Sequence, residues 1–336
     1  MSQKKSFFAL MQKIPGGLII VPMLVGVVLN TFFPQLLSIG GFTTGMFSTG
    51  TSCLLGMFLL LNGAGINVKK IGLPLYKGCV LTLMKFIFGV ALGLLVSRVC
   101  GAAGFAGITP MAIIAALTNS AGGLYLGLAN QYGDESDAGA ISILSLNDGP
   151  FFTMIAMGTA GLASIPLNAF IATLIPLIIG IVWGNADEKF REVSAGALPV
   201  ITFFMMIPIG AGMSFVSLIE GGGAGVILAV ISALTAFLFY FIYQLLLPKK
   251  KRNAMGAAIG TTAANATSVP ASVAEMDSAL APIAGAATAQ VAVAAIVTAF
   301  TAPMITAFLD KRMRRKKLGI YSDEAAQERK DKVINN

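Results

Sequence analysis

The sequence contains no histidine and few charged residues. None of its 336 residues is His, and only 11% are Asp, Glu, Lys or Arg, whereas a soluble domain has about 25% charged residues. The absence of histidine removes the commonest general base and the usual proton switch near neutral pH, so proton chemistry must use carboxylates or lysine. The only cysteines are Cys53, Cys79 and Cys100. They form no zinc-binding spacing, and we expect buried, reduced thiols.

Motifs for enzyme chemistry are also missing. The sequence has no GxxxxGK[ST] phosphate-binding loop, no cysteine pair and no cluster of carboxylates with metal-ligand spacing. A nucleotide-driven motor, a metalloenzyme and a nucleophilic hydrolase are therefore disfavoured. We predict a protein that is not an enzyme and that needs no cofactor.

Apolar residues make up 56% of the chain and fall into ten long stretches. A window of about 20 apolar residues can cross a bilayer, so we predict an all-α integral membrane protein with ten transmembrane helices. The predicted spans are 14–33, 43–66, 73–97, 107–130, 138–162, 166–184, 196–216, 223–247, 254–277 and 281–309. The first apolar run merges into the first span without a small-residue cleavage site, so we expect it to remain in the mature protein.

The basic residues are distributed as in a membrane protein rather than a nucleic-acid-binding protein. The net charge is +8, but Lys and Arg cluster in the segments between spans and in the tail from Lys311 to Lys317. With the N-terminus in the cytoplasm, Arg98 is the one basic residue in an outer loop, as the positive-inside rule requires. Ten spans return the basic C-terminus to the cytoplasm, so we predict that both ends are cytoplasmic.

A weak internal repeat divides the chain into two halves of five spans. The segments NGAGIN at 62–67 and IGAGMS at 209–214 lie 147 positions apart, and Asn119 and Asn265 lie 146 positions apart. An odd number of spans places the second half upside down in the membrane, so the predicted repeat is inverted. The predicted units are residues 1–163, residues 164–310 and a basic cytoplasmic tail, 311–336.

Polar residues interrupt two spans at matching places in the two halves. The fourth span contains AALTNSAGGLY at 115–125, and the ninth contains GTTAANATSVPAS at 260–272. Irregular backbone at membrane depth survives only where protein covers it or where it lines a wet cavity, and paired breaks are typical of a transporter's substrate site. The predicted substrate-binding residues are Thr118, Asn119, Ser120, Asn265, Thr267 and Ser268, with Gln290 and Asn62 as weaker candidates.

Few ionisable groups lie at membrane depth, and each is a candidate functional residue. Lys85 lies near the middle of the third span, where it either binds a substrate carboxylate or forms an internal ion pair, for which Asp148 is a candidate partner. Asp148 lies in the fifth span beside Gly149 and Pro150, and a desolvated carboxylate there suits a proton carrier. Glu275, at the outer end of the ninth span, either lines the outer vestibule or shares the coupling with Asp148.

Four segments resemble the bacterial 2-keto-3-deoxygluconate permeases. They are KIPGGLIIVP at 13–22, GGLYLGLANQYG at 122–133, LSLNDGP at 144–150 and MGTAGLAS at 157–164. The resemblance implies proton symport of an acidic sugar derivative across the bacterial inner membrane. It also implies a fold like that of bile-acid symporters and sodium/proton antiporters, with ten helices and two broken helices, the fourth and ninth, that cross.

One position departs from this family pattern. The family has a glutamate in SLESGP where this chain has Asn147, and the acid here is the next residue, Asp148. A shift of one residue turns a side chain by about 100° around a helix, so the coupling ion and the substrate stay open. The alternative is a proton- or sodium-coupled transporter of another small organic anion, in which Asn119, Thr267 and backbone carbonyls offer oxygen ligands for sodium. The expected partners are this substrate and the lipid bilayer, without nucleic acid, and a homo-oligomer is possible.

Overall fold

The computed structural model describes residues 8, 11, 17–68, 72–101, 104–144, 150–159, 161–164, 167–212 and 215–325. Regular structure in these ranges is helical, apart from an isolated bridge between Phe105 and Ile108. The α-helices are α2 (Gly17–Phe32), α3 (Pro34–Leu37), α4 (Gly41–Phe47), α5 (Thr51–Gly65), α6 (Leu73–Cys100), α7 (Pro110–Thr118), α8 (Gly122–Tyr132), α9 (Glu135–Gly139), α10 (Ile141–Leu144), α11 (Phe151–Thr159), α12 (Leu167–Ala186), α13 (Glu188–Ala211), α14 (Phe215–Leu246), α15 (Met255–Ala258), α16 (Val269–Met276) and α17 (Ala281–Arg315). Short 3₁₀ turns are η2 (Lys249–Lys251), η3 (Ala264–Ser268), η4 (Ser278–Leu280) and η5 (Gly319–Tyr321).

Five helical segments of the described chain are long and apolar enough to cross a membrane. They are Leu73–Cys100, Pro110–Tyr132, Glu188–Ala211, Gly221–Leu246 and Ser278–Tyr321, and the bent pair α4 and α5 could form a sixth. This finding supports an integral membrane protein made of helices, and the count of ten spans stays a prediction.

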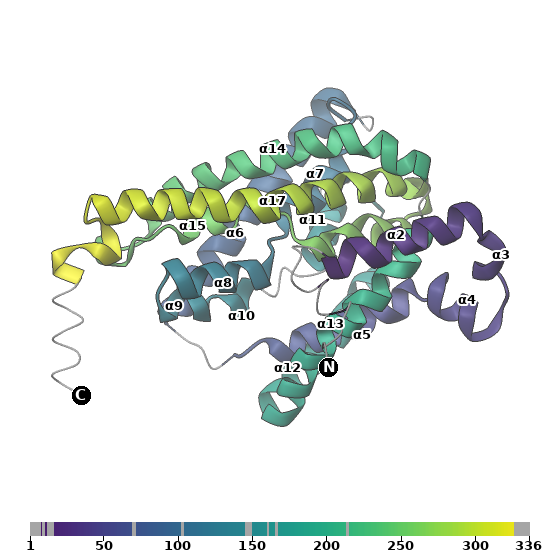
Figure 1. The fold of residues 1–336 in the computed structure, drawn as a ribbon, viewed down its shortest axis with the longest axis horizontal. Coiled ribbons are helices and arrows are strands. Elements are labelled where there is room, and N and C mark those ends of the chain that lie inside the picture. The colour runs from purple at the N-terminus through teal and green to yellow at the C-terminus, as the bar shows by residue number, and fades with distance from the viewer. Residues whose placement is uncertain are drawn as a thin grey trace, which may run out of the picture.

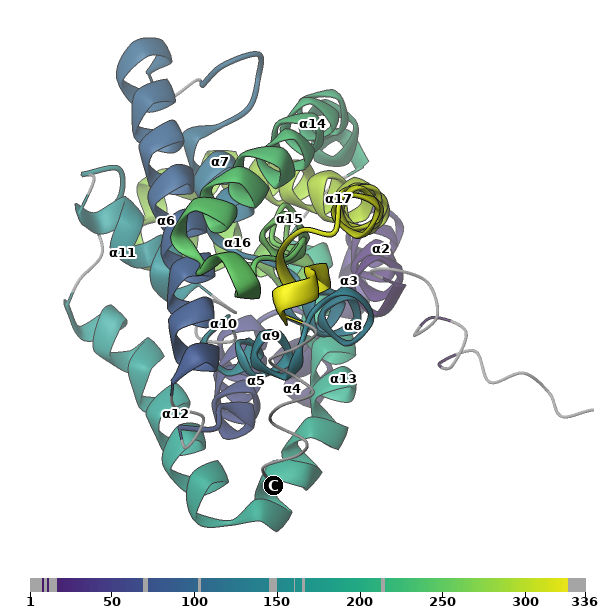
Figure 2. The same ribbon diagram turned by 90° about the vertical axis from the view of Figure 1, so that its left-hand side faces the viewer.

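The helices form two packed groups, called here the first and the second body. Each body contains helices from both halves of the sequence. In the first body, α2 packs on α13, and α5 packs on α12 and α13. The second body contains α6 to α11 and α14 to α17, in which α14 and α17 run side by side (Figure 1). Figure 2 shows α12 and α13 as the two arms of a V that extends away from the second body. The bodies meet at a hydrophobic cluster in which Leu55 and Met206 pack with Ala289 and Ala292.

The two helix pairs of the first body share one kind of close glycine contact. The backbones lie so close that a Cβ at Gly63 of α5 would meet the Leu177 carbonyl of α12, and a Cβ at Gly210 of α13 would meet the Met23 carbonyl of α2. The two glycines are 147 positions apart, and the two carbonyls are 154 positions apart. In the pair α5 and α12 the glycine belongs to the earlier helix, and in the pair α2 and α13 it belongs to the later helix. Both pairs have the same close packing, which small residues permit in membrane helices.

The helix predicted at 43–66 is interrupted. The chain bends by 58° between α4 and α5. The turn brings the Gly50 backbone against the Gly45 carbonyl, where a Cβ has no room, and the Thr44 carbonyl accepts from the Ser48 and Thr49 amides. Glycine is favoured at such close backbone approaches because it has no Cβ.

The prediction of buried cysteines is wrong. Cys53 is exposed, and Cys79 and Cys100 are partly exposed, although all three are free thiols. A free cysteine behaves as a small apolar residue. In a chain of this composition, apolar side chains on the outer face of a helix contact lipid, so an apolar residue does not have to be buried in the protein.

Candidate functional site

The first predicted break is present and separates α7 from α8. Helix α7 begins at Pro110, with the Thr109 hydroxyl accepting from the Ala112 amide at 3.1 Å, and it ends where Asn119 turns to an extended conformation. Helix α8 begins at Gly122. Residues 119–121 are therefore irregular backbone, and Asn119 is fully buried, as the sequence pattern predicts.

The second predicted break is present as well. Helix α15 ends at Ala258, the following residues through Ala263 are not α-helical, and η3 leads into α16 at Val269. Gly260 lies against Ala236 of α14 without room for a Cβ. This close approach explains a glycine at the point where the chain leaves the helix.

The two breaks meet inside the second body. The backbone amide of Ala121, in the first break, donates to the Thr261 hydroxyl, in the second break, at 3.0 Å. Helix α8 also packs on α15, and α7 packs on η3 and α16. Ends of half-helices from both halves of the sequence therefore lie together. Backbone N–H groups with partial positive charge and carbonyl groups with partial negative charge meet at this place.

Lys85 binds the second break directly. Its side chain is fully buried in α6, and its ammonium donates to the Ile259 carbonyl at 2.7 Å and to the Thr261 carbonyl. The two roles predicted for Lys85, binding a substrate carboxylate or pairing with Asp148, stay predictions, because Asp148 lies outside the described residues. A lysine with backbone partners supplies the donors that carbonyls need after a helix ends.

Two of the three predicted polar residues of the first break, Thr118 and Asn119, belong to one hydrogen-bonded cluster. The Thr118 hydroxyl donates to the Ile114 carbonyl at 2.7 Å and lies 3.0 Å from the Thr153 hydroxyl of α11. The Asn119 amide donates to the Ala115 carbonyl at 3.1 Å and to the Thr153 hydroxyl at 3.3 Å.

Two buried oxygens of the first break have no hydrogen-bond partner among the described residues. They are Asn119 Oδ1 and Ser120 Oγ. Buried polar atoms are normally paired, so these two oxygens are candidates to bind a ligand hydroxyl or an ion.

The predicted residues of the second break lie in η3. Thr267 and Ser268 are fully buried, and their hydroxyls donate to the Ala264 and Asn265 carbonyls, each at 2.7 Å. Such bonds to a preceding carbonyl are common for Ser and Thr in membrane helices. Asn265 is half-buried in the same turn.

Sequence reasoning missed several hydroxyls that hold the second break. The Thr262 amide donates to the Thr298 hydroxyl of α17 at 2.9 Å, and the Thr262 hydroxyl lies 3.2 Å from the Ser232 hydroxyl of α14. Thr261 and Thr262 belong to the interrupted segment, so the pattern itself could have identified them. Thr298 and Ser232 lie in otherwise apolar helices, where single hydroxyls give no distinctive signal.

Gln290 and Asn62 lie apart from the break contacts. Gln290 of α17 donates to the Gly107 carbonyl at 2.8 Å and accepts from the Thr109 amide at 3.2 Å, so it fixes the turn that precedes α7. Asn62 is buried in α5, within the first body.

Glu275 lies where the two bodies meet. It accepts a hydrogen bond from the Ser52 hydroxyl of α5 at 2.6 Å, across the boundary between the bodies. It also lines a cavity of about 340 Å³ together with Ser48, Thr51 and Thr288. The cavity is within the size range of small-molecule sites. The predicted coupling residue Asp148 and its neighbour Asn147 lie outside the described residues.

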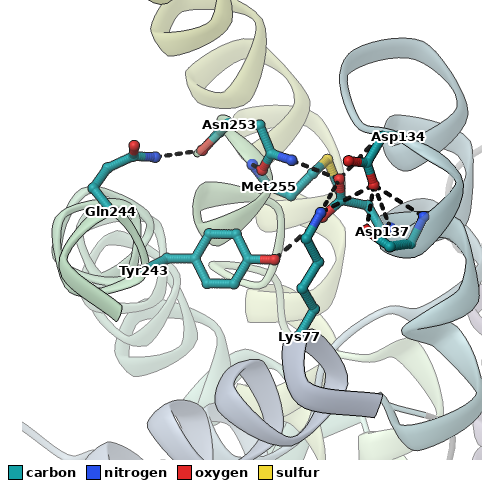
Figure 3. A network of polar contacts seen from close by, with 8 residues as sticks. Lys77, Asp134, Asp137, Tyr243, Gln244, Asn253 and Met255 are labelled. Carbon is teal, nitrogen blue, oxygen red and sulfur yellow. Dashed lines mark hydrogen bonds and ion pairs between the residues drawn. The ribbon is translucent and has the colours of Figure 1, made fainter. Parts of the chain in front are cut away.

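A second buried polar network, which the sequence did not predict, joins four parts of the second body (Figure 3). The fully buried Lys77 of α6 lies 2.8 Å from Asp137 of α9 and 3.0 Å from Asp134. Asp137 also accepts from Tyr243 of α14 at 3.2 Å and from Asn253, just before α15, at 2.5 Å. The available signal was the capping box at the start of α9, in which Asp134 and Asp137 accept from each other's backbone amides.

The two carboxylates of this network have different environments. Burial alone would raise the pKa of Asp134, but the Lys77 ammonium and the hydrogen bonds from Ser136 and its neighbours lower that pKa to about 2. Burial raises the pKa of the more enclosed Asp137, against the opposing effect of Lys77. Four groups donate to Asp137, including the Asp134 amide, and donors to a carboxylate oppose the effect of burial because they favour its charged form.

Comparison with known proteins identifies the family of the chain. A family model described as 2-keto-3-deoxygluconate permease matches residues 8–315. The chain belongs to this family. The 2-keto-3-deoxygluconate permease 1 of Salmonella typhimurium is 42% identical over 304 residues, which cover 90% of this chain and 95% of the relative.

More distant relatives have the same name. The 2-keto-3-deoxygluconate permease of Bacillus subtilis is 35% identical over 314 residues, covering 92% of this chain and 95% of the relative. That of Escherichia coli O157:H7 is 32% identical over 311 residues, covering 91% and 94%. The resemblance predicted from the sequence is confirmed, and the chain is a multi-pass membrane transporter rather than an enzyme.

Proposed function

We propose that the chain imports 2-keto-3-deoxygluconate, an acidic sugar derivative, by proton symport. The observation that carries this proposal is the contact between two interrupted helices, where Ala121, Thr261 and Lys85 join the breaks. Crossed half-helices near the middle of a membrane are typical of secondary transporters. The names of the relatives support the choice of substrate.

We infer that the substrate binds between the crossing and the boundary of the two bodies. A sugar acid has hydroxyls that need both donors and acceptors. Asn119 Oδ1 and Ser120 Oγ are buried acceptors without a partner in the described chain, and the cavity beside Glu275 adds the hydroxyls of Thr51 and Thr288. Asn265, Thr267 and Ser268 lie on η3, which packs on α7.

We infer that transport proceeds by alternating access, with the first body moving against the second. The repeated glycine contacts, Gly63 with α12 and Gly210 with α2, support an inverted repeat of five plus five spans. In a transporter with such a repeat, the state open to one side of the membrane and the state open to the other side have matching geometries. With ten spans, both ends of the chain lie in the cytoplasm of a bacterial cell, and the protein lies in the inner membrane.

Uptake into proteoliposomes tests both the substrate and the ion. Labelled 2-keto-3-deoxygluconate should accumulate when a pH gradient alone is imposed, and it should not accumulate on a sodium gradient alone. The alternative is sodium coupling. Asn119 Oδ1 and Ser120 Oγ, which have no partner in the described part of the chain, favour it because oxygen atoms are hard ligands. Accumulation on sodium alone would establish that alternative, and accumulation of a different organic anion instead would change the substrate.

Asp148→Asn should abolish concentrative uptake on a pH gradient while leaving exchange between equal substrate pools. A proton-carrying carboxylate must alternate between charged and neutral forms, and asparagine is fixed in a neutral form of similar size. Size-exclusion chromatography of the purified variant controls for folding. A folded variant that still concentrates substrate would remove Asp148 from the mechanism and leave Glu275 as the candidate.

Ser52→Ala and Glu275→Ala should each lower the initial uptake rate by about two- to fivefold, as expected for loss of one exposed hydrogen bond to a charged group. Because the two side chains share that bond, the double variant should be no slower than the slower single variant. Ser48→Ala, in the same cavity, is the matched control. Effects that multiply in the double variant would mean that the bond has no role in the transport cycle.

A further inference from the structure

One face of α17 combines an apolar stripe with a cluster of cations. Phe300, Met304 and Phe308 are spaced by four residues, and 52%, 71% and 61% of their surfaces are exposed. Residues four apart lie on the same face of a helix. Beyond Phe308, the same face continues with Lys311, Arg312, Arg315 and Lys316, which are all exposed.

The opposite face of α17 fixes the direction of this stripe. Leu309 and Met313 are buried in a cluster with Ala236 and Tyr240 of α14. The long contact between α14 and α17 is visible in Figure 1, where the basic end of α17 is yellow. The stripe and the cations therefore point outward together, and side-chain packing prevents α17 from turning them inward.

The four cations form no ion pair within the described residues. Their neighbours Arg314 and Lys317 do, with Asp310 at 2.6 Å and Asp323 at 3.2 Å. Lys311, Arg312, Arg315 and Lys316 instead line, together with Phe308, a groove of about 510 Å³. A groove that combines four cations with an aromatic ring suits an amphiphilic anion.

We propose that this face binds an anionic phospholipid from the leaflet at the basic end of α17. The lipid phosphate binds among Lys311, Arg312, Arg315 and Lys316, and an acyl chain lies along Phe308, Met304 and Phe300. Basic groups close to a membrane surface attract anionic head groups, and guanidinium groups can bind phosphate oxygens through two hydrogen bonds. The apolar stripe selects a lipid over a soluble phosphate, because a free phosphate gains nothing from it.

Native mass spectrometry of the full chain tests this site after exchange into nanodiscs of mixed phosphatidylglycerol and phosphatidylcholine. The wild type should retain phosphatidylglycerol preferentially. Lys311→Gln/Arg315→Gln should lower that retention by about fivefold for each cation removed. The matched control is Lys249→Gln/Lys251→Gln, which removes the same charge from η2 and should retain the lipid as the wild type does.

Two further outcomes separate a lipid site from other anion binding. Phe308→Ala, which keeps every charge, should also lower retention of phosphatidylglycerol, and soluble glycerol 3-phosphate should not displace the lipid. Displacement by glycerol 3-phosphate, with no effect of Phe308→Ala, would replace the lipid by a soluble phosphate ligand. Equal losses in the η2 control would reduce the effect to diffuse charge attraction and overturn the proposal.

Discussion

Lys85→Met should lower the initial uptake rate by on the order of 100-fold, or about 3 kcal/mol. The Lys85 ammonium is the charged donor to the Ile259 and Thr261 carbonyls, at the end of α15. Methionine fills a similar volume but donates no hydrogen bond, so two buried carbonyls lose a partner. The break would then lose its fixed geometry even if the helices stay packed. Transport of labelled substrate into proteoliposomes measures the loss.

A matched variant separates this effect from simple loosening of the second break. Ser232→Ala removes the hydroxyl that lies beside Thr262, next to the residue that Lys85 binds, but it changes no charge. We expect it to slow uptake by less than about tenfold, since a neutral hydrogen bond contributes only about 1 kcal/mol. Normal uptake by a folded Lys85→Met protein would show that Lys85 does not set the geometry of the crossing.

Asp137→Asn should lower the free energy of unfolding by about 3–5 kcal/mol, because it leaves the buried Lys77 without its closest counter-charge. An asparagine can accept from Tyr243 or Asn253, but its amide nitrogen cannot accept from the lysine. Asp134→Asn is the matched control, since Asp134 is 32% exposed and water can replace part of its contact with Lys77. Thermal unfolding in detergent compares the three proteins. Equal destabilisation by the two variants would mean that burial of the ion pair does not determine how much the pair contributes to the free energy of unfolding.

The same network predicts how stability depends on pH. The pKa of Asp134 is about 2 in the folded protein, compared with an ordinary value of 3.8. A lowered pKa stabilises the fold above pH 3.8, and this contribution is lost as the pH falls through 3.8 to about 2. The melting temperature of the wild type should therefore fall more steeply over this window than that of Asp134→Asn. Parallel curves would contradict a folded-state role for this carboxylate.

The positions of the breaks could be predicted from sequence because polar and glycine-rich segments are rare in spanning helices. The same argument identified Lys85 as a functional candidate, since a lysine so far from either end of a span needs a partner. Its partners could not be predicted. The Ile259 and Thr261 carbonyls are backbone groups 174 and 176 positions away, and any residue type could have supplied them.

The Lys77 network was missed for a different reason. Lys77, Asp134 and Asp137 lie at the ends of helices, where charged residues usually face water, so their sequence positions suggest solvated loops. Only packing shows that Lys77 and Asp137 are fully buried. Sequence likewise predicted the small residues around Gly63 and Gly210 as a repeat, but not that each glycine packs against the first helix of the opposite half.

The interleaving of the first body affects how the protein is made. Helix α2 packs on α13, and α5 packs on α12 and α13, yet α12 begins only at Leu167. During synthesis, α2 and α5 therefore enter the membrane well before their partners leave the ribosome. Until then, the face of α5 around Gly63 and the face of α2 around Met23, which later pack on α12 and α13, must contact lipid or the insertion machinery. A chain that stops after its first half cannot complete the first body, so that body can assemble only once α13 has been made.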